Sequence, residues 1–280
     1  MTDTDFDAYT KIEAVNWSTL KEMRRSPLHY KHRLTTPRED TPSLALGRAT
    51  HTAVFEPDRF ALEYAVFKGE RRAGKEWEAF KESHKGETIL KLDEYMRCLA
   101  IRDAVRANPV AADYLAEGIA EQTIRWNDKE TGIACKGRYD WYSRKKTTLV
   151  DLKTTKDIDQ RRFAQTAARF GYHSQLAFYA DGLSYHAGRD VDVVIIAVEY
   201  DAPYDVAVFH LDLDVLWAGR EEYQELLRRV AGCRQLGRWP GKYTERQSLE
   251  LPRWVFGDDD ETADDLGLTT GGAHGLSRAV

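Results

Sequence analysis

Two short segments of the chain carry acidic and basic side chains where two strands are expected to end. Residues 137–140 (GRYD) fit a strand that leaves a turn, and residues 150–153 (VDLK) fit the end of another strand. The carboxylates of Asp140 and Asp151 and the ammonium group of Lys153 would then meet at one edge of a sheet. Carboxylate oxygens suit a hard Mg²⁺ ion, and such an ion polarises a phosphate and generates hydroxide from water. These segments therefore indicate metal-dependent hydrolysis of a phosphodiester.

An Asp-x-Lys triplet alone also fits a solvated strand end, so its meaning depends on the other motifs of the chain. Four motifs occur in order: G-x-x-x-H at residues 47–51, G-x-x-D at 137–140, D-x-K at 151–153 and Q-x-x-x-Y at 175–179. Together they resemble the PD-(D/E)xK nuclease superfamily, and specifically its RecB-like branch. The stretches GRYDWY, LVDLKTTKDI and GYHSQLAFYADG are similar to RecE-type exonucleases, and this resemblance extends over about residues 16–256.

The resemblance implies a metal site and a catalytic lysine. Asp140 and Asp151 would be the metal carboxylates, and the main-chain carbonyl of Leu152 would also face the metal. Lys153 would lie beside the attacking water, where it could orient or deprotonate that water or stabilise the developing charge. The expected ion is Mg²⁺.

His51 and Glu121 each have two possible interpretations. A histidine on an apolar helix is often a hydrogen-bonded core residue, but in RecB-like relatives the matching histidine approaches the metal, and a neutral imidazole is a competent ligand. A ligand set with nitrogen would let Mn²⁺ replace Mg²⁺. Glu121 opens the strand before the two motif strands, and it either serves a second metal or is an ordinary edge-strand glutamate.

Several further side chains are candidates for contacts with DNA. Gln175 and Tyr179 are four residues apart and so share a helix face, where an amide and a phenol suit phosphate oxygens or a terminal nucleotide. The alternative is a structural polar stripe between helix and sheet. Tyr172, His173 and Arg138 are the other candidates for DNA binding.

The resemblance implies an exonuclease that degrades one strand of duplex DNA from an end, with 5′-to-3′ polarity. It also implies a ring-like homo-oligomer and recombination with a single-strand annealing protein. Two alternatives stay open: a RecB-like nuclease that is single-strand-specific or endonucleolytic, and a DNA-binding module that has lost catalysis. The intact Asp140, Asp151 and Lys153 argue against the second alternative.

The composition of the chain is compatible with this interpretation but does not establish it. The net charge is −5, but a nuclease needs a basic surface only locally. The apolar runs are too short for a membrane span, and no partner in a membrane is expected. Cys98, Cys135 and Cys233 lie far apart, so we expect thiols in a reducing cytoplasm and no iron–sulfur cluster.

Hydrophobic periodicity predicts an α/β domain with a mixed central sheet and helices on both faces. The predicted helices lie at about residues 18–26, 44–56, 92–108, 110–117, 161–186 and 212–236, and the predicted strands at 121–126, 133–142, 148–152, 191–200 and 204–211. We expect one nuclease domain over 1–256, frayed over 1–14 and irregular over 65–88. The acidic, Gly-rich residues 257–280 are expected to be a disordered tail.

Overall fold

The computed structural model describes residues 6–36, 41–252 and 255, and the chain divides into two compact units, Met1–Lys242 and Tyr243–Val280. The fold and the sites below belong to the first unit. Of the second unit, residues 243–252 and 255 are described, and they carry no strand. The predicted tail, 257–280, lies outside the described residues.

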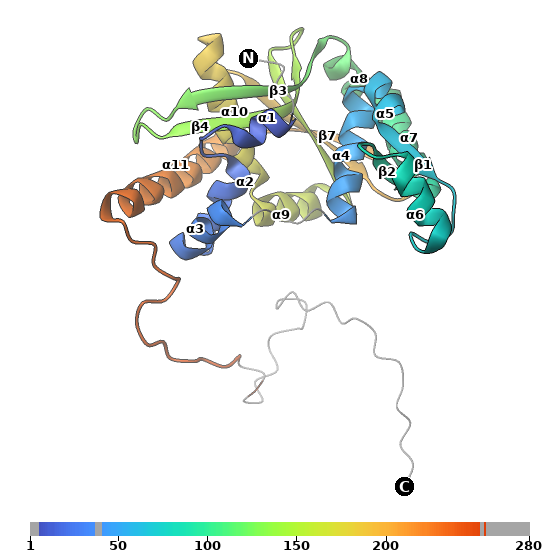
Figure 1. Ribbon diagram of the computed structural model, residues 1–280. Coiled ribbons are helices and arrows are strands. Elements are labelled where there is room, and N and C mark those ends of the chain that lie inside the picture. Colours follow the sequence, from blue (N-terminus) through green and yellow to red (C-terminus); the bar gives the residue numbers. More distant parts are fainter. Residues whose placement is uncertain (1–5, 37–40, 253–254, 256–280) are drawn as a thin grey trace. The chain divides into compact units, whose positions relative to one another are not determined.

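A five-stranded sheet forms the centre of the first unit, in the order β3-β4-β5-β6-β7 (Figure 1). The strands are β3 (Gly118–Asn127), β4 (Ala134–Ser143), β5 (Thr148–Thr155), β6 (Asp192–Glu199) and β7 (Val206–His210). Strands β3, β4 and β5 form an antiparallel meander, β5 pairs with β6 in parallel, and β6 pairs with β7 in antiparallel. The predicted mixed sheet is therefore confirmed.

Strand β6 is buried on both of its faces. Its sequence is a run of β-branched and small apolar residues without polar alternation, which is typical of a strand covered by helices on both sides. Val193 and Ile195 belong to one hydrophobic core, and Val194 and Ile196 belong to the other. The sheet is thus the middle of three layers.

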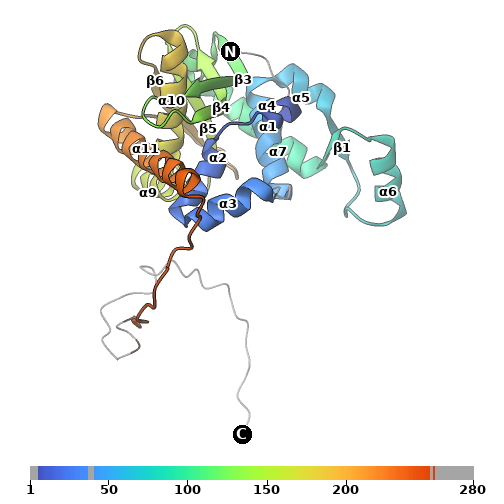
Figure 2. The same cartoon turned by 60° about the vertical axis from the view of Figure 1, so that its left-hand side comes forward.

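Different helices cover the two faces of the sheet (Figures 1 and 2). The core on one face includes residues of α2 (Trp17–Leu20), α3 (Pro27–Thr35), α10 (Tyr172–Ala187) and α11 (Leu213–Leu236). The core on the other face includes residues of α4 (Pro42–Phe55), α7 (Leu92–Ala107) and α8 (Pro109–Leu115). No helix within the described ranges is long and apolar enough to cross a membrane.

Helix starts follow local capping rules. The side chain of Ser26 accepts a hydrogen bond from the backbone of His29 ahead of α3, and Thr41 accepts one from Leu44 ahead of α4. Each helix then has proline in its first turn, where a missing N–H costs nothing. Asp212 is the N-cap residue of α11, although its side chain makes no capping bond.

The prediction of an irregular segment over 65–88 was wrong. It contains β1 (Tyr64–Phe67), α6 (Gly74–Ser83) and β2 (Thr88–Lys91), preceded by α5 (Pro57–Glu63), and β1 pairs with β2 in parallel. Phe67 packs against Trp77 and Phe80 with ring centroids 5.1 and 5.2 Å apart. This small aromatic cluster stabilises a lobe whose surface is otherwise charged, which is why composition suggested a loop.

The single long helix predicted over 161–186 was also wrong. Helices α9 (Gln160–Phe170) and α10 are separated at Gly171, which has a φ of +71°. Glycine adopts this left-handed conformation without steric cost. A Cβ at this position would also lie 2.5 Å from the guanidinium of Arg24, so any side chain would collide with it.

The N-terminal segment contains a helix where fraying was expected. Helix α1 (Phe6–Lys11) lies along β4, followed by α2 and the short η1 (Lys21–Arg24). The buried ammonium group of Lys136 donates to the carbonyls of Tyr9 and Ile12 at 2.7 and 2.8 Å. A cation at a helix C-terminus satisfies carbonyls that lack intrahelical partners, and this lysine fixes α1 in place.

Candidate metal-dependent active site

The candidate site lies where β4 and β5 separate. Their backbone ladder runs from Ser143–Thr148 to Trp141–Val150 and stops there. One residue further on, the carboxylate of Asp140 accepts a 2.9 Å hydrogen bond from the backbone N–H of Leu152. A side chain therefore replaces the next backbone partner, and the gap between the strands holds both motif carboxylates.

Three potential metal ligands converge at this gap. Ligand atoms of His51, Glu121 and Asp140 all lie within 4.8 Å of one another, and each residue is partly buried. His51 comes from α4, and its Nδ1 lies 3.2 Å from Asp140 Oδ2. The three residues line a cavity of about 530 Å³. The structure thus brings together the predicted histidine, the predicted aspartate and the glutamate whose interpretation was open.

Burial and neighbouring charges perturb every group in this cluster. Burial and the charge of Asp140 raise the pKa of Glu121 to about 7, against the influence of His51 and Arg138. Burial would lower the pKa of His51, but Asp140 and Glu121 raise it to about 9. Burial would raise the pKa of Asp140, but His51, Lys153 and the Leu152 N–H outweigh it and lower that pKa. A site with such shifts is poised to exchange protons for a cation.

Asp151 and Lys153 form a buried pair beside this cluster. Lys153 Nζ lies 2.6 Å from Asp151 Oδ2, and Asp151 is only 2% exposed. Burial raises the pKa of Asp151 to about 6 in spite of the lysine. Burial would lower the pKa of Lys153, but Asp151 and Asp140 outweigh it and raise that pKa. The ammonium group also lies 4.8 Å from the ring centroid of Tyr172, a cation–π geometry that fixes its position.

These residues fit a hard divalent cation. Asp151 Oδ2 is buried, and the ammonium group of Lys153 lies 2.6 Å from it. Burying a carboxylate is costly unless it is paired, and a divalent cation would add a second positive partner. Two carboxylates, a third at Glu121 and one imidazole form a donor set that suits Mg²⁺ or Mn²⁺.

Glu121 is placed by an unusual backbone conformation. Its φ is +49°, which is uncommon for a residue other than glycine. Arg138 Nε donates to Glu121 Oε2 at 2.9 Å. Strain of this kind clusters at functional sites. Arg138, predicted as a DNA contact, therefore lies in the cavity wall and orients Glu121.

Of the two remaining motif residues, Tyr179 lines the same cavity and Gln175 contacts Tyr179. The side chain of Gln175 hydrogen bonds to Tyr179, whose hydroxyl pKa is raised well above its usual value by burial. The Tyr179 ring packs so closely on Gly137 that a Cβ there would lie 2.8 Å from a ring carbon. This contact explains the glycine of G-x-x-D: it admits the tyrosine of Q-x-x-x-Y.

The structure also separates some predicted residues and adds others. His173 lies away from the metal cavity, with its Nε2 3.6 Å from Glu222 Oε2 between α10 and α11. Tyr9, Ser18 and Arg48 line the metal cavity and were not predicted. Arg48 lies inside the G-x-x-x-H motif. Tyr9 and Ser18 belong to the N-terminal segment, where no motif spacing indicated them.

The comparison with protein families identifies the chain. A family model described as a PDDEXK-like domain of unknown function (DUF3799) matches residues 16–250. The match spans most of the chain, so the chain belongs to this family, and the predicted PD-(D/E)xK superfamily is confirmed. No curated protein matches the chain significantly.

Solved structures support the same fold. The chain is similar to a crystal structure titled "putative exonuclease" from Eubacterium rectale, with a TM-score of 0.60, 15% identity and coverage of 97% of this chain and 100% of that one. At this identity the likeness shows the fold alone. A crystal structure of SSO0001 has a TM-score of 0.28 and 13% identity over 75% of this chain and 84% of that one, too low for any argument. Family and fold together support a nuclease of a class that uses divalent metals.

Proposed function

We propose that the protein is a metal-dependent DNA exonuclease of the RecE-like kind, which resects linear double-stranded DNA from an end. The observation that carries this proposal is the convergence of His51, Glu121 and Asp140 in one cavity next to the Asp151–Lys153 pair. The amino-acid sequence around the motifs resembles RecE-type exonucleases, and this favours an exonuclease over other nucleases of the fold. The 5′-to-3′ polarity, the ring-like homo-oligomer and the annealing partner belong to this proposal through the resemblance.

The roles of the side chains follow from their positions. A bound divalent metal supplies the charge that polarises the scissile phosphate and makes water acidic. Asp140, Asp151, His51 and the carbonyl of Leu152 would hold it, with Mg²⁺ as the natural ion and Mn²⁺ as a substitute. The ammonium group of Lys153 would orient the attacking water and stabilise the charge that develops on the phosphate.

Glu121 offers a further carboxylate in the cavity, close to His51 and Asp140. It would serve a second metal, which in two-metal sites stabilises the leaving oxygen. Gln175 and Tyr179 would contact the terminal nucleotide from α10, because Tyr179 lines the cavity and Gln175 hydrogen bonds to it.

Incubation of linear and covalently closed duplex DNA with Mg²⁺, Mn²⁺, Ca²⁺ or excess chelator tests the proposal. We expect Mg²⁺ or Mn²⁺ to support loss of the linear form only, and Ca²⁺ to support binding without turnover. Equal loss of both forms would instead indicate an endonuclease. Binding without cleavage under every metal would indicate an inactive DNA-binding module, and robust hydrolysis in chelator would contradict the metal mechanism.

A further inference from the structure

A second cavity lies on the same face of β4 as the metal site. Lys136, Arg138 and Asp140 alternate along β4, so their side chains point to one side of the sheet. Arg138 and Asp140 line the metal cavity, whereas Lys136 lines a separate cavity of about 560 Å³. The N-terminal segment borders both, since Tyr9 and Ser18 line the first and Thr10 and Thr19 line the second.

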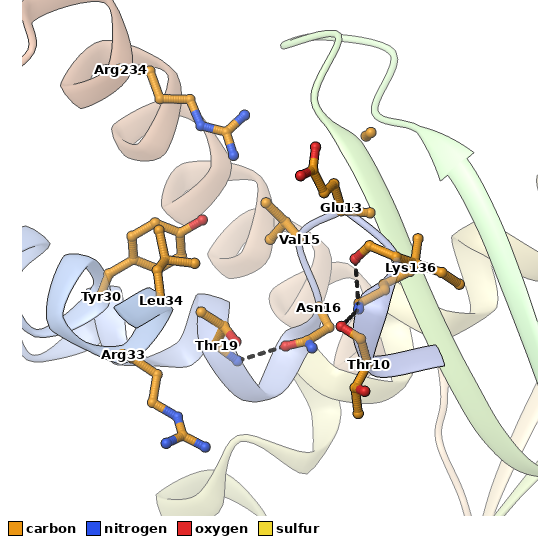
Figure 3. Close-up of a pocket in the computed structure, with 13 residues that line it drawn as sticks. Thr10, Glu13, Val15, Asn16, Thr19, Tyr30, Arg33, Leu34, Lys136 and Arg234 are labelled. Atoms are coloured by element: carbon orange, nitrogen blue, oxygen red, sulfur yellow. Dashed lines mark hydrogen bonds between the residues drawn. The ribbon is translucent and has the colours of Figure 1, made fainter. Parts of the chain in front are cut away.

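The second cavity contains a buried hydroxyl whose proton has no acceptor. Tyr30 is 0% exposed, and the guanidinium of Arg234 lies beside its hydroxyl. A guanidinium can only donate, so the hydroxyl proton has no acceptor among the described residues. Its ring is fixed by stacking on Trp239, with ring centroids 5.5 Å apart. Figure 3 shows this hydroxyl pointing into the space between α11, the N-terminal segment and β4. A buried, unsatisfied donor is costly unless a ligand or water completes it.

The charges around this hydroxyl favour an anion. Arg33, Lys136 and Arg234 line the cavity, and Glu13 is the one acidic residue among its described lining residues. Arg234 reaches in from the end of α11 (Figure 3) and forms no ion pair within the described part of the chain. Lys136 contacts neutral carbonyl oxygens and the ring of Tyr9, and no carboxylate among the described residues pairs with it. A guanidinium beside a hydroxyl donor suits a phosphate group.

We propose that this cavity binds a phosphate of the nucleic-acid strand at a distance from the scissile phosphate, with Arg234 and the Tyr30 hydroxyl as donors. The inference rests on the proposed nuclease function, because that function places a strand along β4. Lys136 and Asp140 are four residues apart on the strand, or roughly 13 Å at the usual rise. This distance is too long for one phosphate to occupy both sites, so a strand must extend beyond a dinucleotide to reach from one site to the other.

The test measures how DNA affinity depends on strand length. Unlabelled single strands of increasing length, from two nucleotides to twelve, compete with a labelled strand in Ca²⁺, so that no cleavage intervenes. For the wild type we expect affinity to rise in a step at the shortest strand that spans both sites, between the dinucleotide and the longest strand tested. Arg234→Gln should reduce affinity about 10-fold for strands beyond the step, leave the dinucleotide unchanged and lower the salt slope by about one.

Two further variants keep the result interpretable. Tyr30→Phe preserves the ring and its stacking on Trp239, so it should fold normally and lose about three-fold in affinity for long strands. Arg229→Gln removes the same charge from α11 but lines a different cavity, and it should behave as the wild type. Equal losses for Arg229→Gln and Arg234→Gln at all lengths would overturn the inference, since the effect would then be general electrostatics.

Two outcomes separate this inference from the proposed function. If the wild type hydrolyses DNA but shows no length step, the strand site is wrong and the nuclease stands. If the step is present and depends on Arg234, but no divalent metal supports cleavage, the strand site stands and the nuclease is wrong. If inorganic phosphate raises the melting temperature of the wild type but not of Arg234→Gln, without a length step, the cavity is a free-anion site and the strand inference is overturned.

Discussion

Two clusters of charged side chains lie near α10, and burial affects the pKa values of their carboxylates differently. At the metal cavity, Glu121, Asp140 and Asp151 adjoin Arg138, His51 and Lys153, and the pKa values of Glu121 and Asp151 are nevertheless raised to about 7 and 6. Between α10, α11 and η1, one carboxylate, Glu222, receives Arg24 at 2.7 Å and also the hydroxyl of Ser174.

In the second cluster the pKa of the carboxylate shifts in the other direction. Burial would raise the pKa of Glu222, but Arg24 and Ser174 outweigh it and lower that pKa. His173 adjoins this second cluster, and burial lowers its pKa. Buried polarity therefore does not mark a reactive site by itself. What distinguishes the metal cavity is that burial keeps the pKa values of Glu121 and Asp151 raised although a cation adjoins each carboxylate.

Among the substitutions considered, the loss of Asp151 should have the largest effect on cleavage. Asp151→Ala should reduce cleavage by about 10³-fold or more, because it removes a shared metal ligand, as losses of central catalytic groups do. Binding of DNA in Ca²⁺ should persist, since the variant removes a negative charge near the phosphates. A near-normal cleavage rate would show that the D-x-K motif is coincidental.

Metal should stabilise the first cluster and leave the second unaffected. At 100-fold excess over its dissociation constant, Mn²⁺ should add about 2.7 kcal/mol to the free energy of unfolding. Thermal unfolding with and without chelator measures this, and Asp140→Asn should abolish the difference. A metal-induced rise that survives Asp140→Asn would place the ion elsewhere.

The second cluster should respond in stability rather than activity. Arg24→Met leaves Glu222 partly buried without its guanidinium, which should cost about 1–3 kcal/mol, or a few degrees in melting temperature. Cleavage per folded molecule should not change. Arg25→Met is the matched control, because Arg25 is 65% exposed in its side chain and should cost little.

Tyr172 tests whether the lysine of the first cluster needs its aromatic neighbour. Tyr172→Phe keeps the ring face under Lys153 and should cleave nearly as the wild type does. Tyr172→Leu should lower kcat about five- to ten-fold, equivalent to about 1 kcal/mol of cation–π interaction. Equal effects of the two substitutions would assign Tyr172 to a hydrogen bond with DNA through its hydroxyl instead.

A third, exposed cluster gives the smallest effect and serves as a reference. His210 donates hydrogen bonds to Asp192 and Asp212, and these carboxylates raise its pKa. A raised histidine pKa contributes stability below the unfolded value of about 6.5, and this is lost as pH rises through the folded value. His210→Gln should therefore lower the free energy of unfolding at pH 5.5 but not at pH 9. The loss should be well under about 1 kcal/mol, because exposed pairs are screened, and thermal unfolding at the two pH values measures it. A larger loss at pH 9 would contradict this.

Periodicity predicted the sheet well because its strands carry strong patterns. Strand β6 is a continuous β-branched run, and β4 and β5 flank a basic turn, so their order was predictable. The lobe of β1, α6 and β2 was missed because three aromatic residues stabilise it within a charged stretch. The break at Gly171 was missed because helical spacing continues across it, and only the backbone angle reveals the change of direction.

The candidate site was predictable only where residues form motifs. His51, Asp140, Asp151 and Lys153 could be named because their order and spacing resemble a known family. The place of Glu121 opposite Asp140 depends on a strained φ that no spacing encodes. Segments that are distant in sequence form the surroundings of Arg138 and Tyr30, so the sequence alone could not predict them.

The order of the strands along the chain also bears on how the site assembles. Strands β3, β4 and β5 are joined by short turns, whereas the parallel pair β5–β6 must wait for α9 and α10 to close a long connection. Local antiparallel pairing is kinetically easier than distant pairing. We therefore expect the meander that carries Asp140 and Asp151 to form early and the imidazole of His51 to join it late. Pulsed hydrogen exchange during refolding would show this as protection in β4 before β6, and the reverse order would refute it.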